Sequence, residues 1–349
     1  MRFLVSRPLR YSSAAAVRTF DVQHSISLNP WFKHSRRRSP AEQSDPVPIP
    51  VALFLQLLAV RADVIVAGDW GLRSVVALLA ARLKRAKFVI WSEETPNSAR
   101  GRSEIQHAIR RWLARRCDAV LAWSQEAVQY ARDIGLNQNR IFRSYQTCDN
   151  DYWLSASKTL DRGSLRIALA VRGTVFLVVG RLLKLKGIHL LLDAWADLDA
   201  SRQRQATLLI VGDGPEAGAL LHQSLRLGLR NVRFLGHMSA DRLVQAYVAA
   251  DVFVLPSLLD VWALVVNEAM LCGLPVLGSR YAGACGEMLT HDGLGRVFDP
   301  LDRPVFAELL SFFVDSASSF DRCDIRRAAA VMNPKLAARG INQMIRALA

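Results

Sequence analysis

The chain has 349 residues, 51% of them hydrophobic and 22% charged, which suits a globular protein with two separate cores and excludes a disordered one. The formal net charge of +14 is concentrated in residues 1–160, which hold 24 Lys and Arg against 13 Asp and Glu. This basic half fits an anionic membrane, a phosphorylated ligand or a solvated surface. Because the sequence carries no recognisable nucleic-acid-binding module, we expect no nucleic-acid partner.

The cysteine pattern and the longest apolar run limit the cellular setting. The five cysteines show no C-x-x-C spacing, which argues against a structural zinc site or a disulfide framework and favours a reducing compartment. The apolar run at 47–60 contains Pro48 and Pro50 and is shorter than the roughly 20 residues of a membrane span. The N-terminus lacks the apolar region of a signal peptide. We therefore expect a cytoplasmic chain that holds no metal.

In chain order, the first half alternates short β-branched runs with amphipathic segments. The pattern predicts strands at 62–68, 87–92 and 118–124, and helices at 72–86, 103–116 and 125–135. Buried strands that alternate with helices of this length indicate a parallel, doubly wound sheet.

The second half repeats the alternation. Strands are expected at 174–180, 207–212, 232–236, 251–256 and 274–279, and helices at 187–198, 215–229, 239–250 and 262–272. The polar stretch 155–164 has the composition of a linker. We predict an α/β protein with Rossmann-like domains at 1–155 and 156–332, and a C-terminal helix at 333–349 that could return to the first domain. In such sheets, ligands bind at the carboxyl ends of the strands.

The loop "VGRLLKLKG" at 179–187 leaves a predicted strand with three cations, Arg181, Lys184 and Lys186. Cations at the start of a helix repel its dipole unless an anion lies among them. A phosphate would resolve this repulsion, since Arg binds it bidentately and Lys binds it as a point charge. The alternative is a solvated loop. The G-x-x-x-x-G-K-[ST] pattern of a P-loop is not present.

The stretch "VGDGPEAG" partly matches a dinucleotide-binding fingerprint. Gly212, Gly214 and Ala217 occupy the G-x-G-x-x-A positions, but no acid ends the next strand to bind a ribose. Pro215 also suits an ordinary helix start. We therefore expect no nicotinamide or flavin cofactor.

The stretch "DVWALVVNEAM" at 260–270 places two acids, Asp260 and Glu268, around an apolar run. The amides of residues 262–264 would form an anion site at a helix N-terminus. Eight helical residues rise about 12 Å, so the two acids cannot hold one small group. They could hold hydroxyls at opposite ends of a nucleoside diphosphate-sugar. Taken singly, either acid also fits an exposed or dipole-stabilising role.

Together and in this order, these blocks resemble the family 4 (group 1) glycosyltransferases of the GT-B fold, over almost the whole second half. The resemblance implies two Rossmann-like domains facing a cleft, and retaining, metal-independent sugar transfer from a nucleotide-sugar to a glycan or lipid-linked acceptor. It implies that Arg181 and Lys186 bind the diphosphate, Asp260 the sugar hydroxyls and Glu268 the ribose. It also assigns to the donor site Gly180, Gly212, Gly214, Trp262, Ala263, Leu264, His237 and Met238.

The sequence departs from this family in both halves. Asp260 stands where the family usually has Glu, and Val261 and Ala263 replace glycines, so each adds a Cβ where a ligand approaches the backbone. The first half lacks the family's Gly-rich loop near its start and its His after a later strand. Glu93 and Glu94 follow that strand instead, either as acceptor-side substitutes or as solvated loop acids.

The helix expected at 103–116 is basic and partly apolar, which favours an anionic membrane surface as a partner. The side chains concerned are Ile109, Arg110, Arg111, Trp112, Arg115 and Arg116. Besides an active glycosyltransferase, two alternatives remain: a catalytically impaired homologue that binds a nucleotide-sugar as a partner protein, and a sugar-nucleotide epimerase. The donor base, the sugar, the acceptor and the oligomeric state stay open.

Overall fold

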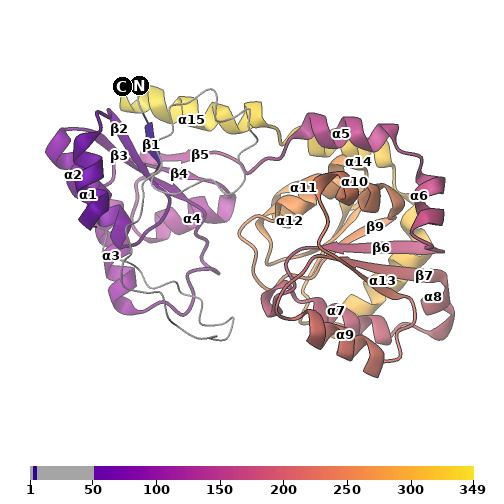
Figure 1. Ribbon diagram of the computed structural model, residues 1–349. Coiled ribbons are helices and arrows are strands. Elements are labelled where there is room, and N and C mark those ends of the chain that lie inside the picture. Colours follow the sequence, from indigo (N-terminus) through magenta and orange to yellow (C-terminus); the bar gives the residue numbers. More distant parts are fainter. Residues whose placement is uncertain (1–2, 6–50) are drawn as a thin grey trace. The chain divides into compact units, whose positions relative to one another are not determined.

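The computed structural model describes residues 3–5 and 51–349, and it divides into two compact units (Figure 1). Unit 1 contains the described residues up to Tyr145 together with Ala337–Ala349, and unit 2 is Gln146–Leu336. Both units are parallel α/β structures, which confirms the predicted fold class. The start of the run at 47–60 lies outside the described residues, as does the segment near the N-terminus where the family's Gly-rich loop would fall and this sequence lacks it.

Unit 1 is built on a five-stranded parallel sheet with the order β1-β2-β3-β4-β5. Its strands are β1 (Phe3–Val5), β2 (Val64–Ala67), β3 (Lys87–Ser92), β4 (Ala119–Ala122) and β5 (Ile141–Arg143). Its helices are α1 (Val51–Ala59), α2 (Leu72–Lys84), α3 (Glu104–Arg116), α4 (Gln125–Asp133) and α15 (Pro334–Leu348).

Strands β2 and β4 of unit 1 are apolar on both faces because each face of the sheet has its own core. Val64 and Val66 of β2 pack in a cluster with Met344 of α15. Ile65 and Ala67, which point to the opposite face, pack in a larger cluster with residues of α1–α4. This two-sided burial explains why the strands read as continuous β-branched runs.

Helix α15 returns from the end of the chain to the sheet of unit 1 (Figure 1). A Cβ at Gly340 would lie 1.8 Å from the carbonyl oxygen of Arg143 at the end of β5, so only glycine permits this close approach. The Ser144 hydroxyl also donates to the carbonyl of Ala337 over 3.1 Å.

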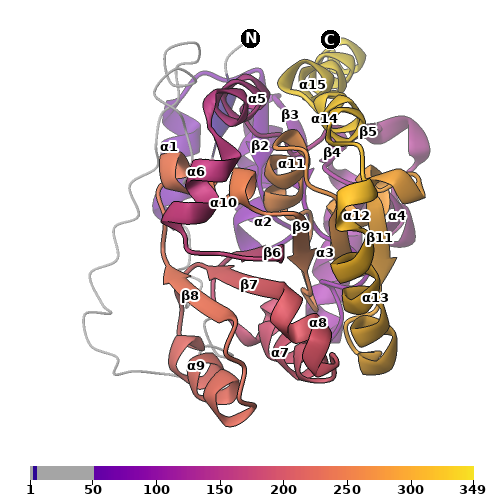
Figure 2. The same cartoon turned by 90° about the vertical axis from the view of Figure 1, so that its right-hand side faces the viewer.

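Unit 2 is built on a six-stranded parallel sheet with the order β11-β10-β9-β6-β7-β8 (Figure 2). Its strands are β6 (Thr174–Val179), β7 (Ala206–Val211), β8 (Val232–Gly236), β9 (Val252–Leu255), β10 (Val276–Ser279) and β11 (Gly295–Phe298). Its helices are α5 (Asn150–Thr159), α6 (Arg162–Ala168), α7 (Ile188–Ala196), α8 (Ala200–Gln205), α9 (Ala217–Arg226), α10 (Ala240–Ala249), α11 (Leu264–Leu271), α12 (Gly283–Met288), α13 (Arg303–Ser316) and α14 (Arg322–Ala330).

The strand order of unit 2 creates a ligand-binding position. From β6 the chain runs outward through β7 and β8, and it then returns to the other side of β6 to continue through β9, β10 and β11. The direction of winding therefore reverses between β6 and β9. In open α/β sheets, ligands bind outside the carboxyl ends of the strands at such a reversal.

The stretch at 155–164 is not a linker, since its residues belong mainly to α5 and α6. Asp161 accepts a hydrogen bond from the amide of Ser164 and so starts α6 directly after α5. The Trp153 ring of α5 packs edge to face on Tyr247 of α10, with centroids 5.6 Å apart. This packing joins α5 to unit 2, so the chain divides at 145/146 and not at 155/156. Within the described residues, no helix is long and apolar enough to cross a membrane.

Candidate active site

The loops that follow β6, β7 and β9 pack backbone against backbone at the reversal point of unit 2. Gly187 has φ +67°, and a Cβ there would lie 1.9 Å from the carbonyl oxygen of Pro256 in the loop after β9. Gly212 has φ +138°, and its Cβ would lie 1.8 Å from the carbonyl oxygen of Gly180. Glycine at these positions lets the three loops approach closely enough to form one surface.

Lys186 and Asp260 form an ion pair on this surface. Lys186 ends a single 3₁₀ turn, 184–186, and its Nζ lies 2.5 Å from Oδ2 of Asp260 in the loop after β9. The Lys186 side chain is 26% exposed to solvent and that of Asp260 is 14% exposed, so both can be reached by a ligand. The structure therefore brings together two residues that the sequence places 74 positions apart. Arg181, in the same loop as Lys186, is exposed.

Backbone hydrogen bonds from the start of α12 hold the loop that carries Asp260. The amides of Gly283 and Ala284 donate to the carbonyls of Asp260 and Trp262 over 3.2 and 2.8 Å. Asp260 in turn donates its own amide to the carbonyl of Tyr281 over 3.0 Å. The backbone at Asp260 is thus held by the connection between β10 and α12.

The helix after this loop begins later than expected. The sequence predicted a helix at 262–272, whereas α11 starts at Leu264, because Ala263 adopts a left-handed conformation with φ +75° and ψ +76°. The Trp262 indole is buried and donates from Nε1 to Oδ1 of Asn267 over 2.9 Å. In the first turn of α11 the amide of Val266 donates to the carbonyl of Ala263 over 3.0 Å, and the preceding amides, which begin at Leu264, lie where a helix N-terminus can face an anion. Ala263 takes a conformation that glycine would adopt without strain.

Glu268 lies on α11 in a mostly apolar setting. Burial raises the pKa of Glu268 to about 7, although the hydroxyl of Tyr247, which donates to Oε2 over 3.0 Å, lowers it. The carboxyl is therefore about half ionised at neutral pH. Sequence reasoning missed Tyr247, because this residue lies on α10 and meets Glu268 only through the packing of two helices.

The remaining residues that the sequence assigned to a donor site also follow the carboxyl ends of strands in unit 2. Gly180 comes directly after β6, Gly212 and Gly214 after β7, and His237 and Met238 after β8 at the edge of the sheet. His237 is exposed and Met238 is half-buried. Their common location is what a ligand spread across the ends of β6–β9 requires.

In unit 1, Glu94 is held in an internal network. Arg102 contacts both carboxylate oxygens of Glu94 at 2.9 and 3.1 Å, and Arg110 reaches Oε2 at 3.0 Å. Burial acts to raise the pKa of Glu94, but the two guanidinium groups hold it below its usual range. Arg110 also donates to the Tyr130 hydroxyl over 2.5 Å. Glu94 is thus a half-buried carboxylate paired with two arginines, and Glu93 beside it is exposed.

Arg110 does not belong to the basic surface of α3 as the sequence suggested, since it is 5% exposed and turned toward Glu94. Arg111, Arg115 and Arg116 are exposed on the same helix. Within residues 3–5 and 51–349, no group of three or more His, Cys, Asp or Glu side chains is placed to hold a metal ion.

Comparison with known proteins relates the second half of the chain to one family and the whole chain to one fold. The family model described as glycosyl transferases group 1 matches residues 166–329. D-inositol 3-phosphate glycosyltransferase 2 of Catenulispora acidiphila is 30% identical over 226 residues, which cover 61% of this chain and 51% of that protein. The chain thus spans about half the length of this curated relative.

Two solved structures resemble the whole chain. The Anabaena protein HepE in complex with UDP superposes with a TM-score of 0.74 at 22% identity, covering 99% of this chain and 98% of that one. Sucrose-phosphate synthase from Thermosynechococcus elongatus gives a TM-score of 0.74 at 20% identity, covering 96% and 90%. The chain therefore has the GT-B fold, and residues 166–329 match the model of the group 1 glycosyl transferases.

Proposed function

We propose that this protein is a glycosyltransferase that moves a sugar from a nucleotide-sugar donor, with retention at the anomeric carbon and without a metal, to a glycan or lipid-linked acceptor of the cell envelope. The observation that carries the proposal is the arrangement of Lys186, Asp260 and Glu268 around the start of α11, at the reversal point of the sheet. The HepE structure, which holds UDP, makes a uridine nucleotide the first donor to test.

Each part of this arrangement suits one part of such a donor. Glu268 would accept hydroxyl groups of the ribose, and the amides at the start of α11 would face the diphosphate. Arg181 and Lys186 would stabilise the negative charge that grows on the diphosphate as the sugar leaves, a contribution that is usually the largest in catalysis. Asp260, released from Lys186 when phosphate pairs with the lysine, would accept hydroxyls of the sugar.

The test is sugar transfer, or slow hydrolysis of a radiolabelled UDP-sugar, in the presence of a chelator. We expect Arg181→Ala and Lys186→Ala to lower the rate at least about 100-fold, the order of loss seen when one electrostatic contact to a developing charge is removed. Lys184→Ala is the matched control, since Lys184 is an exposed cation of the same loop and should leave the rate unchanged. Equal rates in all three variants would refute the assigned roles.

A catalytically impaired homologue is the second candidate, and two observations favour it. Ala263 adds a methyl group in a left-handed conformation at the start of α11. The family's sugar-contacting His, expected after the strand at 87–92, is not present. Glu94, which follows that strand here, is already paired with two arginines. This candidate predicts that UDP binds and that Lys186→Ala weakens binding, while neither transfer nor donor hydrolysis is detected.

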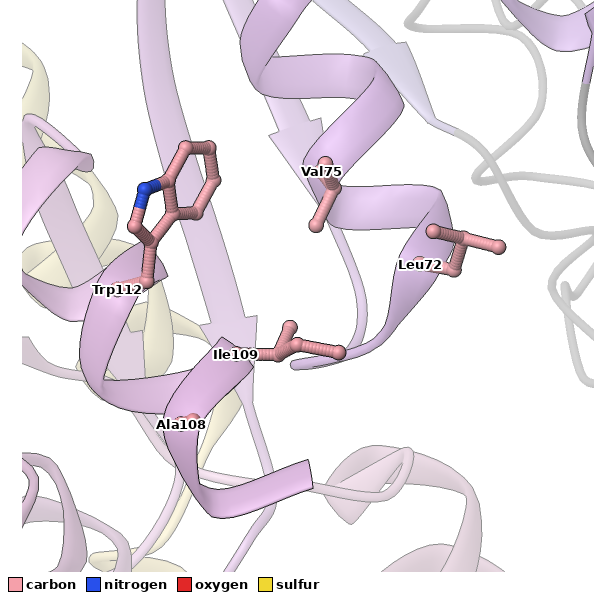
Figure 3. A pocket seen from close by; sticks show the side chains of 5 residues that line it. All are labelled: Leu72, Val75, Ala108, Ile109 and Trp112. Atoms are coloured by element: carbon pink, nitrogen blue, oxygen red, sulfur yellow. The ribbon is translucent and has the colours of Figure 1, made fainter. Parts of the chain in front are cut away.

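We also propose that the protein binds the cytoplasmic face of an anionic membrane through α2 and α3. An open hollow of about 380 Å³ between these helices is lined by apolar side chains alone, namely Leu72, Val75, Ala108, Ile109 and Trp112 (Figure 3). Further exposed apolar residues continue this surface, Leu79 and Leu83 on α2 and Ile105 on α3. The exposed Arg111, Arg115 and Arg116 add positive charge beside them. Apolar and cationic side chains on one surface suit the interface of an anionic bilayer.

Flotation with vesicles that contain anionic phospholipid tests the membrane proposal. We expect the wild-type protein to float, and the variant Arg111→Glu/Arg115→Glu/Arg116→Glu to stay in solution. The control variant Arg226→Glu/Arg230→Glu reverses two exposed charges in unit 2 and should float normally. Normal flotation of the α3 variant would remove this helix from the membrane contact.

A further inference from the structure

Tyr247 and Glu268 make a buried contact inside unit 2. The hydroxyl of Tyr247, on α10, donates to Oε2 of Glu268, on α11, over 3.0 Å. The Tyr247 ring is completely buried, with Trp153 edge to face at 5.6 Å and Phe253 tilted at 5.9 Å between centroids. These rings enclose the Tyr247 side chain, and its hydroxyl lies closer to the carboxylate of Glu268 than to its second acceptor, the carbonyl of Val265 at 3.5 Å.

Among the residues that the structure describes, three titratable groups face Glu268, and they differ in their effect on its charge. They are Tyr247 from α10, Cys148 from the segment before α5, and Cys272 at the end of α11. Burial raises the pKa of both thiols to about 12, so they stay neutral at neutral pH. Among these groups, the Tyr247 hydroxyl is the one that favours the charged form of Glu268 and so opposes the effect of burial.

We propose that Tyr247 is a positioning residue for the donor, which holds one oxygen of Glu268 in place and favours its carboxylate form so that it can accept ribose hydroxyls. The inference rests on the proposed function, since it assigns the ribose to Glu268. A charged carboxylate accepts stronger hydrogen bonds than a neutral carboxyl group. In the neutral group, one oxygen carries a proton and therefore acts as a donor. Donor affinity should therefore fall as the pH drops through the titration of Glu268.

The first experiment follows the Glu268 carboxyl directly and needs no donor. Glutamate labelled with ¹³C at the carboxyl carbon is titrated by NMR, and the Glu268 signal is the one that Glu268→Gln removes. We expect a midpoint of about 7 in the wild type and of about 8 in Tyr247→Phe, because the loss of a hydrogen bond to a charged group shifts a titration by about this much. Phe keeps the ring and its packing.

Tyr152→Phe is the matched control. Tyr152, on α5, also donates its hydroxyl to a carboxylate, that of Asp241 on α10, over 2.7 Å. Unlike the pair of Tyr247 and Glu268, this pair is exposed. Its loss should leave the Glu268 midpoint at about 7. An unchanged midpoint in Tyr247→Phe, or an equal shift in Tyr152→Phe, would overturn the inference.

The second experiment measures the affinity for UDP-glucose between pH 6 and 9. A midpoint of 8 leaves about one tenth of Glu268 charged at pH 7, against one half in the wild type, so Tyr247→Phe should bind at least about fivefold more weakly at pH 7, and this charge-dependent part of the deficit should disappear by pH 9. Glu268→Gln should bind weakly with no pH dependence of this kind. A constant deficit of Tyr247→Phe at every pH would show a merely structural role and contradict the inference.

The two experiments separate the failure of the inference from that of the proposed function. If the wild type binds no nucleotide-sugar at any pH while the Glu268 midpoint still shifts in Tyr247→Phe, the proposed function is refuted, and with it the role of Tyr247 in donor binding. If donor binds and the midpoint does not shift, the inference alone is refuted.

Discussion

Replacing Glu268 by Gln should make the protein more stable at alkaline pH while it removes donor binding. The buried carboxyl is costly to ionise, and Gln presents the same shape with an oxygen that still accepts the hydroxyl of Tyr247. The expected gain follows from the pKa of Glu268, which burial raises from its ordinary value of 4.5 to about 7.

The sign and size of the effect follow from proton linkage. Because the folded state binds the Glu268 proton more tightly than the unfolded state, this proton stabilises the fold fully below pH 4.5, and the contribution is lost as the pH rises through 7. A pKa rise from 4.5 to about 7 corresponds to about 3 kcal/mol, an upper figure for a side chain that keeps some contact with solvent. Gln does not titrate, so the free energy of unfolding of the variant does not include this decrease with rising pH.

The assay is urea unfolding of the wild type and Glu268→Gln at several values between pH 5 and 8. As the pH rises across this range, the free energy of unfolding of Glu268→Gln should increase by about 2–3 kcal/mol relative to that of the wild type. Glu308→Gln, which replaces an exposed glutamate on α13, is the control and should follow the wild type. Parallel curves for the wild type and Glu268→Gln would refute the reasoning about burial.

Three further substitutions test other parts of the structure. Ala263→Gly should raise the free energy of unfolding by about 1 kcal/mol in thermal or urea unfolding, because glycine adopts φ +75° without strain. Gly340→Ala should release α15 from unit 1, seen as faster proteolysis of the C-terminus, because its Cβ would overlap the carbonyl of Arg143. Glu94→Ala should lower stability by about 3–5 kcal/mol in urea unfolding, since it leaves Arg110 buried without its partner; a loss below 1 kcal/mol would contradict this.

Much of the fold could be predicted because local patterns and packing agree. The strands at 87–92 and 174–180 are continuous apolar runs, and the structure places them as β3 and β6. The helix at 103–116 was recognisable from its basic, periodic sequence and appears as α3. The stretch 155–164 was misread, because its polar residues form helices that pack through Trp153 and Asp161, and neither contact leaves a local pattern.

The site was predictable in its residues but not in their contacts. Asp260 and Lys186 were both singled out, yet their ion pair depends on how the loops after β6 and β9 meet. The early start of the helix at 262 was wrong because Ala263 adopts a left-handed conformation that its residue type disfavours. Nothing in the sequence pointed to Tyr247, and the helical pattern placed Arg110 on the basic surface of α3. Each of these residues contacts an acid on another element, which no local pattern reveals.

The most direct test of the donor site is calorimetric titration with UDP, GDP, ADP and dTDP, of the wild type and of the variants Arg181→Ala/Lys186→Ala and Lys184→Ala. We expect one nucleotide to bind the wild type and Lys184→Ala alike, and the double variant to bind it at least about tenfold more weakly, because charged contacts to phosphate are lost. Equal affinity in all three proteins, or no binding of any nucleotide to the wild type, would contradict it.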